Sequence, residues 1–228
     1  MIRDKIVIAI DGPAASGKST TAKLVAKKLN LNYIDTGAMY RAITLAVLQA
    51  GVSPSNKDDV EFIAMNVNIK IEHDKEFLLK VMLNEIDVSK EIRKNDISNN
   101  VSVVCMYPLV RKRMVELQRE MGKKGGVVLD GRDIGTVVYP NADVKIYMIA
   151  NIESRAKRRF LELEKSGEII DLKDLIKDIL ERDRIDSTRD ESPLKKADDA
   201  IELDTSNMSI TEQVNSVLKI IETKTNVL

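Results

Sequence analysis

The first feature with chemical potential is a glycine-rich segment close to the N-terminus. Residues 12–19 have the sequence GPAASGKS, with glycines at the first and sixth places followed directly by Lys18 and Ser19. This is the spacing of a phosphate-binding loop: backbone N–H groups surround a phosphate, the lysine reaches the β- and γ-phosphates, and the hydroxyl ligates Mg²⁺. An ordinary β–α turn explains neither Lys18 nor the apolar run before it. We therefore predict a nucleotide-binding site here.

Arginines beside small or acidic residues form a second signal. Arg41 and Arg132 occur in such settings, and further arginines lie between residues 182 and 189. A second substrate that carries a phosphate would need clamps of this kind, because the guanidinium group binds phosphate oxygens in pairs. Asp130 ends the apolar run 127–129, where a strand-end carboxylate can hold an Mg²⁺-bound water near the phosphate loop. Strand-end caps are common, so Asp130 alone does not decide the question.

The region after Asp171 has a helical repeat that starts apolar and continues charged. Its members follow one another in steps of three and four: Leu172, Leu175, Ile179, Arg182, Asp186 and Arg189. Either these charges continue the inward stripe and face a cleft, or the helix ends near Arg184 and they are solvated. The residues alone leave both possibilities open. A similar choice holds for Arg155, Arg158 and Arg159, which could form a plain basic helix face.

These residues need a scaffold, and short apolar runs alternating with helical patterns supply one. A helix follows the glycine-rich segment, with Ala22, Val25, Ala26 and Leu29 on its inner face, and another is expected over residues 211–222. Continuous apolar runs suit strands that are buried on both faces of a parallel sheet. The fold class is therefore α/β, a five-stranded parallel sheet with helices on both faces. The expected strands lie at residues 6–10, 33–34, 127–129, 144–149 and 200–203.

Two stretches break the alternation. Residues 67–88 show period-two alternation with a turn at 73–75, which predicts a small antiparallel sheet inserted into the core. Residues 152–189 are dense in charge and are interpreted as a mobile helical cover over the site. We expect one domain over residues 1–228, divided into a core of 1–60, 103–151 and 190–228, an insert of about 61–102 and a lid of about 152–189.

The composition excludes several classes of function. The chain has 36 Lys and Arg against 36 Asp and Glu, so no global field favours nucleic acid or an anionic membrane. One cysteine, Cys105, and one histidine, His73, exclude a disulfide framework and a Cys/His zinc site. We interpret His73 as a solvated turn residue, and Cys105 and Met106 as core. With no signal-peptide core and no span of about 20 apolar residues, we expect a cytoplasmic protein.

Four motifs occur in order along the chain: the phosphate loop, DTGAMYR at 35–41, DGRDIGTVV at 130–138 and ERDR at 181–184. With them, essentially the whole chain resembles the bacterial cytidylate kinases. The GRDIGT segment and the β-rich insert set that family apart from adenylate kinases. The resemblance implies transfer of the γ-phosphoryl group of ATP to CMP or dCMP with Mg²⁺. It further implies small-molecule nucleotides as partners, no nucleic acid or membrane, and a monomer.

The resemblance also assigns roles by position. For the ATP phosphates it implies the loop and the lid arginines, without deciding which arginine touches ATP: Gly12, Pro13, Ala14, Ala15, Ser16, Gly17, Lys18, Ser19, Thr20, Arg155, Arg158 and Arg159. Residues 204–209 resemble the loop beside the adenine. Ser19 and Asp130 are the expected metal-site residues.

For CMP the resemblance implies contacts to the phosphate, the base and the sugar. The expected residues are Thr36, Arg41, Ser102, Arg111, Arg132, Asp133, Asp186 and Arg189. Of these, Ser102, Arg132 and Asp133 are expected at the base, and Asp186 at the sugar, which favours the cleft interpretation of the charged stripe. Many relatives have Ser where this chain has Thr36. Lys18, Arg132, Arg182 and Arg189 are the expected catalytic set. A kinase with another small-molecule acceptor and a nucleotide-dependent switch protein remain the alternatives.

Overall fold

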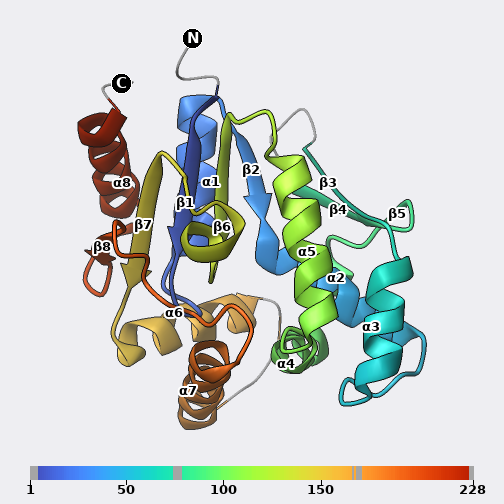
Figure 1. Cartoon of the computed structure of the whole chain (residues 1–228). Helices are drawn as coiled ribbons and strands as arrows, with labels where there is room; N and C mark the ends of the chain where they lie inside the picture. The colour runs from blue at the N-terminus through green and yellow to red at the C-terminus, as the bar shows by residue number, and fades with distance from the viewer. Residues whose placement is uncertain (1–4, 74–78, 166, 168–170, 226–228) are drawn as a thin grey trace. The chain divides into compact units, whose positions relative to one another are not determined.

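The computed structural model describes residues 5–73, 79–165, 167 and 171–225, and Figure 1 shows its ribbon. The chain forms two compact units, one of residues 1–32 and 125–228 and the other of residues 33–124. The expected division into core, insert and lid remains a prediction. Within the described part of the chain, no helix combines the length and the apolar character that crossing a membrane would require.

A five-stranded parallel sheet is the centre of the fold and confirms the predicted class. Its strands occur in the order β2-β6-β1-β7-β8. Their bounds are β1 Val7–Asp11, β2 Asn32–Asp35, β6 Val127–Gly131, β7 Val144–Ile149 and β8 Ile201–Asp204. Ile8, Ile10 and Leu129 are fully buried, as expected for central strands covered on both faces. In the register Asp11 pairs with Gly131, so the carboxyl ends of β1 and β6 lie side by side.

Helices α1 (Lys18–Leu29) and α8 (Ile210–Thr225) pack against each other and against the sheet. The turn of π-helix η3 (Ile134–Val138) contacts β1 and β6 on the opposite face (Figure 1). The inner face of α1 is apolar, with Ala22 and Val25 fully buried, as the helical spacing predicts. Helix α8 confirms the expected final helix.

The charged region consists of two helices, α6 (Ile152–Lys165) and α7 (Leu172–Thr188), which pack together. Their contact is a small apolar cluster made of Ala156, Leu163, Leu175 and Ile179. Helix α7 begins after Asp171, whose side chain accepts a hydrogen bond from the Lys173 backbone N–H. The two helices therefore pack together through apolar side chains, while their buried residues also include Arg155 and Asp186.

The described residues of the second unit form a three-stranded antiparallel sheet in the order β3-β4-β5 and four α-helices. Its elements are α2 Thr36–Gln49, α3 Lys57–Asn66, β3 Ile69–His73, β4 Leu79–Leu83, β5 Ile86–Asp87, η2 Glu91–Arg93, α4 Asn95–Val104 and α5 Pro108–Met121. The predicted small antiparallel sheet is confirmed. His73 is the last residue of β3 rather than a turn residue, and residues 74–78 lie outside the described part. Cys105 is buried, but Met106 is 39% exposed, so its assignment to the core is wrong.

Candidate functional site

The phosphate loop connects β1 to α1 in the first unit. Three of its residues have positive φ: Gly12 at 147°, Ala15 at 56° and Gly17 at 94°. At Gly12 a side chain is excluded, because a Cβ atom there would lie 2.0 Å from the Met148 carbonyl oxygen of β7. Left-handed residues between right-handed ones turn successive N–H groups toward one centre, which forms an anion-binding concavity. The loop backbone thus fits a phosphate, as the spacing of the glycines predicted.

Lys18 is the first residue of α1 and is only 5% exposed. Its Nζ donates a hydrogen bond to the carbonyl of Pro13, a residue of the same loop, at 2.7 Å. Burial, reinforced by the positive charge of Arg132, lowers the pKa of Lys18 to about 7, although Asp130 opposes this shift. Nearby negative charge does not fully offset the cost of burying the Lys18 ammonium group. An anionic phosphate bound beside Lys18 would therefore strongly favour the protonated form of the lysine.

Ser19 and Asp130 lie together at the end of β6. The Ser19 hydroxyl donates to Asp130 Oδ2 at 2.7 Å, and Asp130 is 4% exposed. Hydroxyl and carboxylate oxygens are the hard ligands that Mg²⁺ prefers, and Mg²⁺ is commonly held by one or two such groups together with nucleotide phosphates. This donor pair therefore fits a nucleotide-bound magnesium ion.

Asp11, the last residue of β1, organises the turn that follows β6. Its carboxylate accepts hydrogen bonds from the backbone N–H groups of Ile134 at 2.8 Å and Gly135 at 2.7 Å. Burial raises the pKa of Asp11 to about 7, while the two N–H groups act in the opposite direction. The turn that Asp11 holds follows directly after Arg132 and Asp133. Sequence reasoning missed this residue; the available signal was a carboxylate at the end of an apolar strand.

The buried Asp186 of helix α7 forms an ion pair with Arg132 at the end of β6, whose side chain is 17% exposed. Arg132 Nε donates to Asp186 Oδ2 at 2.7 Å, and Arg189 Nη1 donates to Asp186 Oδ1 at 3.3 Å. Burial alone would raise the pKa of Asp186, but Arg132 and Arg182 hold it below its ordinary value. The same pair raises the pKa of Arg132 although burial opposes its charge. The arrangement is a preorganised group of guanidinium charges around one carboxylate.

Helix α7 decides the alternative left open by the charged stripe. The helix continues to Thr188 with Arg189 as its C-terminal cap, so an end near Arg184 is wrong. Asp186 and Arg189 are 4% and 8% exposed, which makes them buried rather than solvated. The Arg189 guanidinium also donates to the Ser192 carbonyl at 2.9 and 2.7 Å. The stripe is therefore buried at Leu175, Ile179, Asp186 and Arg189, while Arg182 is half-buried.

The three arginines of α6 have different surroundings. Arg155 pairs with Asp183 and donates to the Ala14 carbonyl at 3.3 Å, while Asp183 accepts from the Ala14 N–H at 3.4 Å. Arg158 donates to the carbonyls of Ser16 and Thr205. Arg159 pairs with the exposed Glu162 at 3.2 Å. Two of these arginines thus contact the phosphate loop backbone, so the interpretation as a plain basic face does not hold for them. Their contacts to ATP remain predictions.

In the second unit, the expected phosphate contacts gather around the start of α2. Asp35 caps the helix by accepting from the Ala38 N–H at 2.8 Å, and its other oxygen accepts from Arg41 at 3.0 Å. Thr36 is the first residue of the helix and is 3% exposed. This ion pair directs the Arg41 guanidinium back toward the N-terminus of α2, where Thr36 begins the helix.

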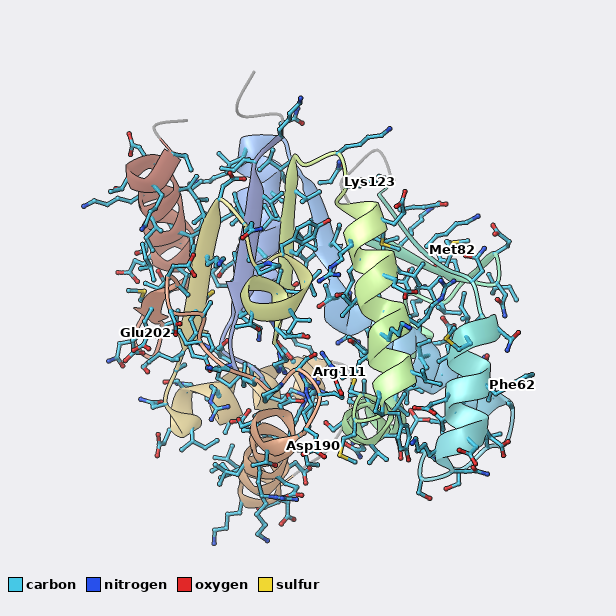
Figure 2. All side chains as sticks on the ribbon, in the orientation of Figure 1. Phe62, Met82, Arg111, Lys123, Asp190 and Glu202 are labelled. Atoms are coloured by element: carbon cyan, nitrogen blue, oxygen red, sulfur yellow. The ribbon has the colours of Figure 1, made fainter. Side chains whose placement is uncertain are left out.

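The other expected residues of the second unit lie on α4 and α5. Ser102 is buried on α4, and Arg111 is buried on α5, where Figure 2 labels it. The Arg111 guanidinium lies 5.3 Å from the centre of the Tyr40 ring, in a cation–π arrangement. It also donates to the Cys105 carbonyl at 3.4 Å. A buried arginine supported in this way is rigid enough to present charge to an anion.

Within the first unit the structure brings together most of the predicted residues: the loop, Asp130, Arg132, Asp186 and Arg189. Asp133, also predicted, is 5% exposed at the start of η3. Arg182 lies on α7, where its charge acts on both Lys18 and Asp186. Sequence reasoning missed Asp11, and it named Asp183 and Thr205 only as members of residues 181–184 and 204–209, without a role of their own. Each contacts a predicted site segment from a distant part of the chain.

Comparisons with known proteins agree with this geometry. The family model described as cytidylate kinase matches residues 8–223. A cytidylate kinase of Bacillus pumilus is 52% identical over 217 residues, covering 95% of this chain and 96% of the relative. One of Fusobacterium nucleatum is 52% identical over 220 residues, covering 96% and 98%. The crystal structure of a gluconokinase from Sinorhizobium meliloti aligns with a TM-score of 0.50 at 12% identity, covering 99% of this chain and 97% of that one, which is a likeness of fold.

Proposed function

We propose that this chain, which belongs to the cytidylate kinase family, transfers the γ-phosphoryl group of ATP to CMP or dCMP. The observation that carries the proposal is the site of the first unit, where a phosphate loop with a buried lysine adjoins the ion pair of Arg132 and Asp186. Arg132 is near enough to Lys18 for its charge to lower the lysine pKa. Such a concentration of positive charge suits a donor and an acceptor that both carry phosphate.

The proposed donor is ATP, with its phosphates in the loop formed by residues 12–20. The N–H groups of the loop and Lys18 neutralise charge that moves onto the β–γ bridging oxygen during transfer. Ser19 and Asp130 would hold Mg²⁺, which supplies neutralisation of the phosphate oxygens when bound. The lowered pKa of Lys18 supports this assignment, because bound phosphate restores the charge that burial disfavours.

The proposed acceptor is the phosphate of CMP, which is itself the nucleophile. No side chain needs to remove a proton, because a phosphate monoester is largely ionised near neutral pH, with a second pKa of about 6. The residues then act by alignment and charge neutralisation. We assign Thr36, Arg41 and Arg111 to the acceptor phosphate. We also assign Arg132 to the acceptor phosphate and to the base.

The remaining residues are assigned to selecting the acceptor nucleotide and to neutralising the charge of the phosphates. We assign Ser102 and Asp133 to the cytosine, Asp186 to the sugar, and Arg182 and Arg189 to the phosphates. The buried Asp186 with its arginine partners supports this role, because a carboxylate held by several donors keeps a fixed orientation. Water is the competing acceptor, and we propose that helices α6 and α7 exclude it when both nucleotides are bound.

A coupled ADP-release assay tests the proposal, with CMP, dCMP, UMP, AMP and GMP offered separately and gluconate as a non-nucleotide acceptor. We expect fast ADP release with CMP and dCMP and only slow release without an acceptor. Preference for another acceptor would support a different small-molecule kinase. ADP release that is slow and independent of every acceptor would support a nucleotide-dependent switch. The chain is expected to act as a cytoplasmic monomer.

A further inference from the structure

Thr205 follows β8 and is fully buried, with 0% exposure. Its backbone N–H donates to the Ile149 carbonyl at 2.8 Å, which extends the pairing of β8 with β7 by one residue. Its hydroxyl oxygen lies 2.8 Å from the Ser16 carbonyl and 2.9 Å from that of Ile149. A hydroxyl has one proton to donate. It can therefore donate to only one of these two carbonyls at a time, and the Ser16 carbonyl is the nearer of the two.

The Ser16 carbonyl also accepts a hydrogen bond from Arg158. Arg158 Nη1 donates to it at 3.1 Å, and the same nitrogen lies 3.2 Å from the Thr205 hydroxyl oxygen, which accepts from it. The other guanidinium nitrogen donates to the Thr205 carbonyl. Thr205 and Arg158 thus support each other and jointly hold one carbonyl of the phosphate loop.

We propose that Thr205 is a positioning residue for the phosphate loop: its hydroxyl, together with Arg158, holds the Ser16 carbonyl so that the Gly17 N–H points at bound phosphate. The reason lies in the peptide group, which is planar and trans, so its C=O and N–H point in opposite directions. Fixing the Ser16 oxygen outside the loop turns the Gly17 N–H toward its interior. Gly17 has φ of 94°, a region where glycine is otherwise free to swing.

The contact also polarises the peptide. A carbonyl that accepts from a guanidinium and a hydroxyl makes the N–H on the same peptide a stronger donor, because hydrogen bonds in series reinforce one another at low dielectric. The effect applies to any phosphate chain in the loop and does not depend on the adenine. Thr205 therefore acts on the phosphates, although residues 204–209 were expected beside the base.

The inference rests on the proposed ATP site and adds a residue to it. The test is binding of Mg·ATP and of Mg·tripolyphosphate to the full chain by titration calorimetry, for wild type, Thr205→Val and Thr205→Ser. Valine keeps the shape and removes the hydroxyl, while serine keeps the hydroxyl. We expect the valine variant to bind both ligands roughly five- to tenfold more weakly, the effect of one lost hydrogen bond. We expect the serine variant to bind as wild type does.

Thr44→Val is the matched control. Thr44 is also fully buried, and its hydroxyl donates to a backbone carbonyl, that of Tyr40 at 3.0 Å, but within α2 of the second unit. We expect this variant to bind both ligands as wild type does. If Thr205→Val does not fold, Thr205→Ala takes its place with the same expectation. Steady-state kinetics give a further readout: KM for ATP rises in the Thr205 variant while KM for CMP stays within about twofold.

Several results would overturn the inference. Unchanged affinity in a folded Thr205→Val protein would show that the hydroxyl does not position the loop. Weakened binding in Thr205→Ser, or in Thr44→Val, would assign the effect to packing. Weaker binding of ATP with unchanged binding of tripolyphosphate would place Thr205 at the adenine. If wild type binds neither ligand, the proposed function itself fails, a result distinct from the others because it appears before any substitution.

Discussion

Replacing Asp186 by alanine removes the carboxylate at the centre of the buried charge cluster. Its side chain is 6% exposed, and its two oxygens accept from Arg132 at 2.7 Å and Arg189 at 3.3 Å. The substitution removes the nearest counter-charge of two guanidinium groups, the buried one of Arg189 and the largely buried one of Arg132, whose side chains are 4% and 17% exposed. Removing one partner of a buried pair typically costs about 3–5 kcal/mol of unfolding free energy. For a chain of this length, that loss corresponds to a fall in Tm of roughly 6–20 °C.

Glu181→Ala is the control, because Glu181 lies on the same helix and pairs with Arg184 at the same 2.7 Å. The difference is exposure: these side chains are 56% and 64% exposed. Solvent screens such a pair, so we expect no measurable change in midpoint. Asp186→Asn keeps an acceptor oxygen without the charge. Its loss of unfolding free energy should therefore lie between those of Asp186→Ala and Glu181→Ala.

The assay is urea unfolding followed by far-UV circular dichroism, with thermal melts alongside. The pKa of Asp186 is lowered in the folded protein, so its ionised form adds stability above the unfolded-state pKa. This contribution is lost as the pH falls through the folded pKa. The stability difference between wild type and Asp186→Asn should therefore shrink below about pH 4. Equal midpoint shifts for Asp186→Ala and Glu181→Ala would refute the reasoning from burial.

Three further predictions concern the loop, the base and the strand carboxylate. Lys18→Ala should retain its fold but lose at least about a hundredfold in kcat, because it removes a charge that stabilises the transition state; an unchanged kcat would contradict this. Asp133→Asn should narrow the CMP-to-UMP ratio of kcat/KM, because an amide can rotate to donate to the uracil O4 whereas a carboxylate only accepts; a constant ratio would show that Asp133 does not choose the base. Asp11 has a folded pKa of about 7 against 3.8 for an ordinary aspartate, so the folded state binds its proton more tightly. Wild-type stability should fall as the pH rises between about 4 and 7, by up to about 4 kcal/mol, and urea unfolding of Asp11→Asn should lack this component.

The strands and the phosphate loop could be predicted because their signals are local. A short continuous apolar run such as residues 144–149 is typical of a strand that is covered on both faces of a sheet, and these residues form β7. The loop spacing at residues 12–19 carries its own backbone geometry, which the positive φ values at Gly12 and Gly17 bear out. His73 ended a strand instead of lying in a turn, because strand ends are set by pairing with Leu79 rather than by composition.

The supporting contacts could not be predicted because they join distant parts of the chain. Asp11 and Ile134 are 123 residues apart, and Ser16 and Thr205 are 189 apart. No periodicity links such positions; the sheet order brings them together. The charged end of α7 could be predicted only in part. Its repeat was visible, but only packing decides whether Asp186 and Arg189 are buried, since helical spacing alone is the same for a solvated face.

The most direct test of the central claim follows the label of [γ-³²P]ATP in the presence of CMP. We predict that the label appears in the β-phosphate of CDP, one per ADP formed, and that Lys18→Ala forms none above background. Release of the label as inorganic phosphate, at a rate that does not depend on CMP, would contradict the account.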